Sequence, residues 1–535
     1  MQTERYIAAA DLGSSKVALT VAKVEGDDIQ IIYYKEVPSD GMRYSCVYNP
    51  AKASGPLKTV IEDAENELNI KILQLVIGLP RYNVRQEFAS ARMDRSDPDS
   101  CITREEVNAL KNIAVDSYPI ENEAKEEIYG AIAQSFSADD DVVNGSEGDV
   151  VGVAAEAIEG NFKIFIGSSK AVNNLDRMMN NVGVAPAKKI FVPTATASAV
   201  LTEAEKENGV ALVEIGAGVS SVTIYKGRLM RHFSSIPFGG KSITSDIKYE
   251  CGFTEKLAEN IKLAFGACMP DKLQSMNEKI IQINDNENGT YEQLPVKYLS
   301  EIISSRAREI INAILFQIQE SGLADSLRNG VVLTGGCANL VNLANMLKEM
   351  SGYTVRIGYP RSQVFSSGGC PGVCETSAAA SVGMVIEARK DFRLNCIEEA
   401  PVPQETESPE TGAEGQPVLD ENGDGELFKE HAEGEVLTPS KKKKKKEEEK
   451  LRNSLKVGDK ITTIGGIVGK IVDMKDDNIT IETSMDRVRM ELAKWSVMTN
   501  NTAQEAAQKA RAEAQAAAKE RAAKKKAEKE AKKKK

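Results

Sequence analysis

Residues 211–218 read ALVEIGAG, an apolar run with one carboxylate that ends in two glycines around an alanine. Another strand-like run, 222–225, follows at once, so this stretch predicts two strands joined by a tight hairpin turn. Small residues at such a turn let backbone N–H groups approach a phosphate closely. The candidate phosphate-binding residues are therefore Glu214, Gly216, Ala217 and Gly218.

The same pattern occurs about 200 residues earlier, where residues 11–16 read DLGSSK between the strand-like runs 6–11 and 17–24. Its aspartate can hold Mg²⁺ through a water molecule, and its lysine can add positive charge beside a phosphate. One Gly-Ser turn between strands is common, but two such hairpins form a degenerate repeat, which suits a nucleotide held between two related domains. The candidate residues here are Asp11 (the metal contact), Gly13, Ser14, Ser15 and Lys16.

A third motif, VVLTGGCA at residues 331–338, is a buried strand that ends in a double glycine. Glycines at this place allow a flat adenosine to lie against the backbone. A purely structural Gly-Gly turn is the alternative, but the ordered set of three motifs favours a nucleotide site. Gly335 and Gly336 are the residues predicted to flank the adenosine.

In this order, the motifs resemble the actin superfamily, which includes actin, MreB, the heat-shock chaperone ATPases and the sugar kinases. Two further stretches resemble the FtsA family of bacterial cell-division proteins: IPFGG at 236–240, followed by ITSDI at 243–247, and AENIK at 258–262. The resemblance covers roughly residues 5–390 and implies ATP and Mg²⁺ as cofactors. It also implies that Glu259 and Lys262 face the ribose and the adenine.

The resemblance further implies a filament-forming protein that links the FtsZ ring to the inner membrane and recruits other division proteins. Such a protein is cytoplasmic and lies peripherally on the inner face of that membrane. Three positions depart from the superfamily pattern: Glu214 replaces the usual aspartate, Ala217 replaces a glycine, and Val192 stands where the chaperones carry an acidic residue. Since hydrolysis needs a positioned nucleophile, we expect at most a slow ATPase that acts as a polymerisation switch.

The sequence is less compatible with other functions. An actin-fold kinase needs an aspartate base beside a sugar cleft, and no convincing candidate is present. A chaperone ATPase would carry a much larger peptide-binding β-domain. A basic tail is compatible with nucleic acid, but it lacks interleaved aromatic residues, so sequence-specific readout is not expected. With only two histidines, the chain offers little for histidine-based hydrolase chemistry.

The domain organisation follows from composition. Residues 1–395 alternate short strands and amphipathic helices, which predicts an α/β body of actin-like duplicated domains. A charged stretch at about 81–165 predicts a small inserted α+β subdomain, with strands at 150–157 and 162–166 near its end. Residues 396–450, acidic and then lysine-rich, predict a disordered linker. Strand-like runs within 451–500 predict a small all-β domain, and residues 501–535 form an Ala/Lys-rich basic tail.

The C-terminal part also bears on membrane attachment. Two stretches, RNSLKVGD at 452–459 and TIGGIVG at 463–469, carry a second resemblance. With them, residues 452–498 resemble the cytoplasmic β-domain of YajC, an accessory subunit of the preprotein translocase. FtsA proteins usually end in an amphipathic helix, whereas residues 391–400 are too short and acidic for that purpose. Although the net charge is -11, residues 441–535 contain 27 Lys/Arg against 15 Asp/Glu. The basic tail, rather than the acidic body, is therefore expected to meet anionic surfaces.

Overall fold

The structure is a computed structural model, and it describes residues 4–139, 141–143, 147–273, 278–285, 290–399, 456–463, 468–475, 478–483, 489–493 and 497–500. The chain divides between residues 407 and 408 into two compact units, here called the body and the C-terminal unit. Most of the predicted linker and all of the predicted tail lie outside the described residues. In the part that the structure describes, no helix has both the length and the apolar character needed to cross a membrane.

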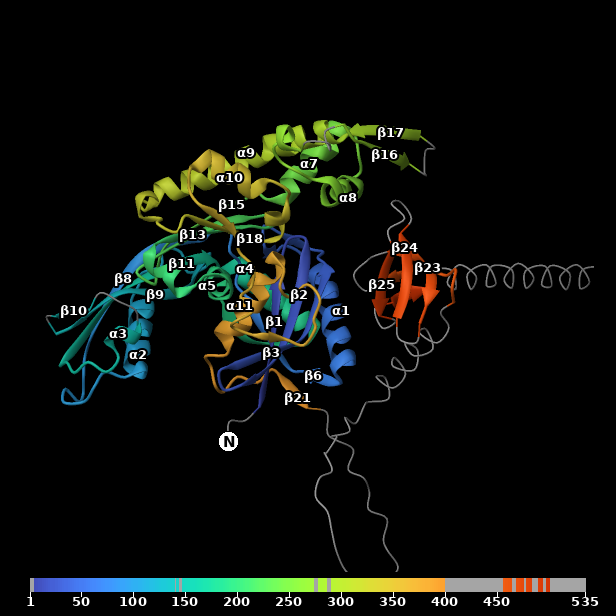
Figure 1. Cartoon of the computed structure of the whole chain (residues 1–535). Coiled ribbons are helices and arrows are strands. Elements are labelled where there is room, and N and C mark those ends of the chain that lie inside the picture. The colour runs from blue at the N-terminus through green and yellow to red at the C-terminus, as the bar shows by residue number, and fades with distance from the viewer. Residues whose placement is uncertain are drawn as a thin grey trace, which may run out of the picture. The chain divides into compact units, whose positions relative to one another are not determined.

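The first sheet of the body contains the first predicted hairpin (Figure 1). Its antiparallel half consists of β1 (Arg5–Leu12), β2 (Lys16–Glu25) and β3 (Asp28–Pro38). Its parallel half continues from β1 through β7 (Gln74–Gly78) and β12 (Ala185–Ile190). A short strand, β20 (Ser366–Ser367), pairs with the outer edge of β3.

The second sheet repeats this order. Its antiparallel half consists of β13 (Val210–Ile215), β14 (Ser220–Lys226) and β15 (Leu229–Ile236). Its parallel half continues from β13 through β18 (Val331–Thr334) and β19 (Val355–Ile357). Because β1 and β13 occupy equivalent places in two sheets of the same topology, the predicted α/β class with duplicated domains is confirmed.

Helices cover both sheets and lie between them. The helices of the first domain are α1 (Pro50–Leu68), α4 (Ser169–Val182), α5 (Val192–Val200) and α11 (Ala379–Ala388). The helices of the second domain are α6 (Glu203–Asn208), α7 (Gly240–Cys251), α8 (Glu255–Phe265), α9 (Val296–Glu320) and α10 (Leu343–Ser351). Figure 1 shows α5 and α11 between the sheets, with α9 on the far side of the second sheet.

The alternation of side chains along β13 explains why the second sheet needs cover on both faces. Val210 and Leu212 belong to the core that α5 and α11 share with the first sheet. Ala211, Val213 and Ile215 point to the other face and belong to a separate core with α7 to α10. Successive residues of a strand point to opposite faces, so an unbroken apolar run indicates a strand buried on both sides.

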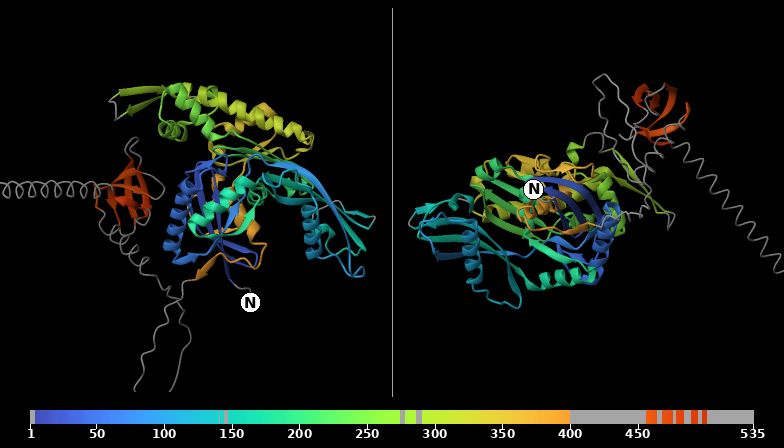
Figure 2. Two further views of the ribbon diagram at one scale, coloured as in Figure 1. Left: turned by 180° about the vertical axis from the view of Figure 1, so that it is seen from behind. Right: turned by 90° about the horizontal axis from the view of Figure 1, so that it is seen from below.

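The inserted subdomain is an antiparallel sheet in the order β10-β9-β11-β8, and it projects from one side of the body (Figure 2). Its elements are β8 (Arg85–Asp94), α2 (Arg104–Asp116), β9 (Glu126–Ala138), β10 (Asp141–Val143), α3 (Glu147–Val150) and β11 (Ala157–Ser168). The predicted strand at 162–166 lies within β11, but the one at 150–157 is wrong. Gly152 has a φ of +92°, which interrupts an extended run, and only an isolated bridge joins Ala154 to Cys101.

The structure describes the C-terminal end of the body, whereas the predicted domain boundaries remain predictions. Leu394, Cys396 and Ile397 are buried in its core, and β21 (Ile397–Glu399) pairs with β6 (Ile70–Ile72). This segment therefore contributes to packing of the body. The remaining short elements are β4 (Met42–Arg43), β5 (Cys46–Val47), β16 (Ile280–Asp285), β17 (Thr290–Pro295) and the 3₁₀ turns at 270–272, 324–326, 336–339 and 376–378.

The C-terminal unit contains an antiparallel sheet in the order β25-β24-β23-β22-β26. Its strands are β22 (Lys460–Thr463), β23 (Val468–Met474), β24 (Asn478–Thr483), β25 (Arg489–Ala493) and β26 (Val497–Asn500). Ile461, Ile471, Ile479 and Ile481 form a small core. The predicted all-β class of this unit is confirmed.

Candidate functional site

The first hairpin turn lies at the end of β1. Gly13 donates its N–H to the carbonyl of Lys16 at 2.9 Å, and a Cβ atom on Gly13 would lie 2.8 Å from that oxygen. The Ser14 hydroxyl accepts the N–H of Ser45 at 2.8 Å. Hydrogen bonds within the turn and from the loop that follows β3 thus hold the turn in place. Position 13 requires glycine, because a Cβ atom there would collide with the Lys16 carbonyl.

The second hairpin has the same construction at the end of β13. Gly216 donates its N–H to the carbonyl of Val219 at 3.0 Å, again three residues ahead. The first turn of α7 then packs on this hairpin, because Gly240 donates to the carbonyl of Gly216 at 2.9 Å and Lys241 donates to that of Ala217 at 2.7 Å. The two predicted hairpins therefore share the same backbone geometry. Only the second one also has the N-terminus of a helix, α7, packed on it.

The two hairpins meet. The Lys241 Nζ atom donates to the carbonyl oxygen of Ser14 at 2.7 Å. A Cβ atom on Gly218 would lie 2.7 Å from the Ser14 hydroxyl oxygen. At this point the backbones of the two domains are so close that no further side chain would fit between them. Lys241 was missed by the sequence reasoning, although it directly follows the IPFGG stretch that carried the family resemblance.

Arg81 joins the carboxylates of the two hairpins. Its guanidinium pairs with Asp11 at 3.3 Å and, through its other terminal nitrogen, with Glu214. The Thr196 hydroxyl donates to the second Glu214 oxygen at 3.2 Å. Burial alone would lower the pKa of Arg81, but the charges of Glu214 and Asp11 raise it overall. The side chains of the three charged residues are only 9–12% exposed.

The sequence-based prediction also missed Arg81, although the order of the strands could have indicated it. It comes three residues after β7, and β7 runs parallel to β1. Carboxyl ends of neighbouring parallel strands meet at one edge of a sheet, which is where ligands bind in open α/β folds. A charged residue just beyond β7 is therefore placed next to Asp11 at the end of β1.

The double glycine lies at the end of β18, beside the second hairpin. Gly335 has a φ of +87°, and its carbonyl accepts the Thr376 hydroxyl at 2.9 Å. A Cβ atom on Gly335 would lie 2.6 Å from the carbonyl oxygen of Ile215, whereas nothing lies within 4 Å of the corresponding position on Gly336. The first glycine is thus required by the backbone, and the second borders open space.

Lys262 and Glu259 lie together next to this turn. The Lys262 Nζ atom donates to Glu259 at 2.8 Å and to the carbonyl of Gly240 at 3.1 Å. A Cβ atom on Gly240 would in turn lie 3.6 Å from the Cys337 sulfur. Burial raises the pKa of the Cys337 thiol to about 11, so it is neutral at physiological pH. The residues predicted to face ribose and adenine are therefore gathered at one place between α7, α8 and the double glycine.

One predicted side chain points elsewhere. The Lys16 ammonium pairs with Glu36 on β3, and Glu36 also accepts the Ser377 hydroxyl at 3.0 Å. Burial opposes the ionisation of Glu36, but the hydrogen bonds from Lys16 and Tyr34 lower its pKa overall. Lys16 thus lies beside the hairpin with a carboxylate partner, and Lys241 is the lysine that reaches the hairpin contact.

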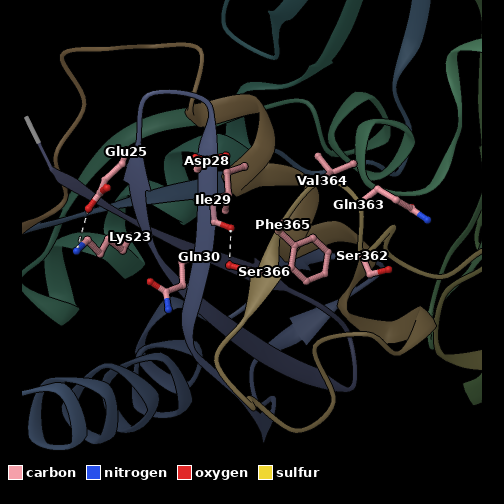
Figure 3. A pocket seen from close by; sticks show the side chains of 10 residues that line it. All are labelled: Lys23, Glu25, Asp28, Ile29, Gln30, Ser362, Gln363, Val364, Phe365 and Ser366. Carbon is pink, nitrogen blue, oxygen red and sulfur yellow. Dashed lines mark hydrogen bonds and ion pairs between the residues drawn. The ribbon is translucent and has the colours of Figure 1, made fainter. Parts of the chain in front are cut away.

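Two hollows on the body lie away from these residues. One, of about 460 Å³, lies between the β2–β3 hairpin and residues 362–366, and its side chains are shown in Figure 3. Another, of about 1100 Å³, is lined by the inserted subdomain, α5 and the segment that follows α11. Neither is lined by any of the predicted site residues.

The residues at the hairpins fit a nucleotide better than they fit a bare metal ion. Gly13, Gly216 and Gly218 carry no side chains at the two turns, so the backbone there can approach a phosphate closely. Lys241 and Arg81 supply positive charge nearby. Asp11 and Glu214 are oxygen donors of the kind that Mg²⁺ prefers. However, both are already paired with the Arg81 guanidinium.

Comparisons with known proteins bear on the body and on the C-terminal unit. Residues 211–383 match the family model described as cell division protein FtsA, and residues 436–501 match YajC, described as a preprotein translocase subunit. FtsA of Borreliella burgdorferi is 30% identical over 365 residues, which is 67% of this chain and 86% of that protein. FtsA of Neisseria meningitidis is 28% identical over 363 residues, with 67% and 85% covered.

Among solved structures, the PilM–PilN type IV pilus biogenesis complex aligns with a TM-score of 0.50 at 15% identity. The alignment covers 73% of this chain and 99% of that one, and at this identity it bears on the fold alone. The likeness of the C-terminal segment to YajC is confirmed by the family match. With its duplicated actin-like body and these relatives, the chain belongs to the FtsA family of cell division proteins.

Proposed function

We propose that this protein is an ATP-binding, actin-like filament former of bacterial cell division, and that nucleotide between the two hairpins switches its polymerisation. One observation carries the site: Lys241 of the second domain donates to the backbone of Ser14 in the first domain at 2.7 Å. Groups from both domains therefore meet where a phosphate chain would be held. Membership of the FtsA family supports the role in division.

In this proposal, the phosphates lie between residues 13–16 and residues 214–218, with Lys241 as an added contact. Adenosine would be flanked by Gly335 and Gly336, with Glu259 and Lys262 toward the ribose and adenine. Bound Mg²⁺ would neutralise phosphate charge, with Asp11 reaching it through a water. Turnover is slow in this proposal, so the bound nucleotide acts as a switch.

The proposed partners are other copies of this chain, FtsZ and further division proteins, on the cytoplasmic face of the inner membrane. Lysine clusters at 441–446, 524–526 and 532–535 would attract an anionic leaflet, each residue contributing about 1 kcal/mol near the surface. These clusters lie outside the described residues. No sequence-specific nucleic acid is part of the proposal.

Sedimentation of the full chain with and without ATP tests the central claim. We expect polymers that depend on nucleotide, and FtsZ filaments that pull the protein into the pellet. An absence of nucleotide-dependent pelleting under all conditions would refute the switch. For the membrane, binding to anionic liposomes should fall steeply as salt rises and be lost on truncation after Ser440. Binding that survives either change would place the membrane contact elsewhere.

A further inference from the structure

Arg81 connects all three parts of the body. It lies on the segment between β7 of the first domain and β8 of the inserted subdomain. Its guanidinium pairs with Asp11 at the end of β1 and with Glu214 at the end of β13. Its neighbour Tyr82 packs on Tyr44, with 5.1 Å between ring centroids, in the loop that holds the first hairpin.

The carboxylates of Asp11 and Glu214 need a positive charge nearby to balance them. Asp11 and Glu214 are two carboxylates buried close to one guanidinium, and two negative charges that share a buried site repel each other. In metal-dependent phosphate sites, a divalent cation usually supplies the compensation. Here one side chain, itself 9% exposed, already contacts both carboxylates and neutralises half of their combined charge. Its planar fork can engage two acceptors at once, which a lysine cannot do.

We propose that Arg81 is a built-in counter-ion that balances Asp11 and Glu214 in place of a bridging divalent cation. Mg²⁺ then enters only with the phosphates of the nucleotide, and nucleotide binding depends only weakly on it. This inference rests on the proposed nucleotide site and adds how its charge is balanced. It also gives the inserted subdomain a direct link to the site, because Arg81 lies on the strand connection into that subdomain. Loss of the guanidinium would create a carboxylate pair that binds metal.

The first experiment uses the full-length protein without nucleotide, so it is independent of ATP binding. We would compare the thermal midpoints of wild type, Arg81→Gln and Arg81→Gln/Glu214→Gln with and without millimolar MgCl₂. Mg²⁺ should leave wild type unchanged, stabilise Arg81→Gln by several degrees, and stabilise the double variant less, because one carboxylate of the pair is gone. An equal response of wild type and Arg81→Gln to Mg²⁺ would overturn the proposal.

Arg85→Gln is the matched control. Arg85 lies four residues further along, at the first position of β8, where it pairs with Glu126 at 3.1 Å and its side chain is 35% exposed. Its loss removes the same charge without touching Asp11 or Glu214, so its response to Mg²⁺ should equal that of wild type. If Arg85→Gln also gains stabilisation from Mg²⁺, the effect is not specific to the hairpin carboxylates and the proposal fails.

The second experiment measures binding of a fluorescent ATP analogue in Mg²⁺ and in EDTA. For wild type, the affinity should change by less than about threefold, and for Arg81→Gln by about tenfold or more, because the uncompensated carboxylates then repel phosphate. If wild type binds nucleotide but needs Mg²⁺ as much as Arg81→Gln does, the counter-ion role is wrong and the nucleotide site stands. If wild type binds no nucleotide in either buffer, the proposed function itself fails, and this inference fails with it.

Discussion

The hydroxyl oxygen of Ser14 lies 2.7 Å from the position that a Cβ atom would take on Gly218. The Ser14 Cβ atom is nearly as close to that position, at 3.0 Å. The two residues belong to hairpins at the ends of β1 and β13, in different domains. Their approach brings the two hairpins into contact at this point, and it leaves no room for a methyl group on Gly218.

A Gly218→Ala substitution should therefore push the hairpins apart and weaken nucleotide binding. Overpacking of this kind typically costs about 1–3 kcal/mol, so we expect a loss of affinity of about tenfold or more. In the Ser14→Gly/Gly218→Ala double variant, the space returns and part of the loss should be recovered. Titration with a fluorescent ATP analogue measures both, and wild-type affinity in the single variant would contradict the geometry.

The fold was predictable because its evidence is local. The apolar run of β13 and the small residues after β1 and β13 are visible in the sequence. Arg81 and Lys241 were not found, since each lies outside its hairpin and reaches it only through tertiary contacts. Arg81 needs the parallel pairing of β7 with β1, and Lys241 needs α7 packed on the second hairpin. Within the inserted subdomain, the apolar residues around Gly152 resembled a strand, but the positive φ of that glycine breaks it.

The two glycines after β18 should respond differently to substitution. Gly335→Ala places a Cβ atom 2.6 Å from the Ile215 carbonyl oxygen at a φ of +87°, which should cost about 1–3 kcal/mol of folding free energy. Gly336→Leu meets no atom within 4 Å of its Cβ, so stability should stay within about 0.5 kcal/mol of wild type. Its side chain should instead block the adenosine and abolish nucleotide binding.

Thermal unfolding together with nucleotide titration separates these effects. A Gly336→Leu variant that folds like wild type and still binds the ATP analogue with unchanged affinity would show that adenosine does not lie there. A Gly335→Ala variant with wild-type stability would instead contradict the requirement for a left-handed conformation at that turn.

ATP turnover should be slow because Val192 does not provide a polar group for the attacking water. Val192 is 2% exposed at the first position of α5, and a Cβ atom on Gly78 would lie 2.5 Å from its side chain. The residue therefore fills space between α5 and the end of β7. We expect steady-state phosphate release below about 1 per second, which is the lower end for kinases. Gly336→Leu serves as the blank for contaminating ATPases, and a faster release that this variant abolishes would refute the expectation.

His232 should make the junction with the inserted subdomain sensitive to acid. It lies on β15, where its Nδ1 atom is 2.9 Å from the Gln86 side-chain nitrogen on β8, and its Nε2 atom is buried without a partner among the described residues. Burial, with a smaller contribution from the charge of Lys163, lowers the pKa of His232 from 6.5 to about 4. Arg231 adds a further positive charge on the same strand, and the Lys163 ammonium donates to its carbonyl.

Because the pKa of His232 is lower in the folded protein than in the unfolded chain, the unfolded chain takes up the proton first as the pH falls. The stabilisation from a neutral His232 is therefore complete above about pH 6.5 and is lost progressively toward pH 4. Solvent screens a partly buried ring, so we expect a loss of about 1 kcal/mol between pH 7 and pH 5. Urea unfolding of wild type and His232→Gln at both values measures it. The substitution should remove that share of the pH dependence, since glutamine does not titrate, whereas equal slopes in the two proteins would show that His232 is not the group responsible.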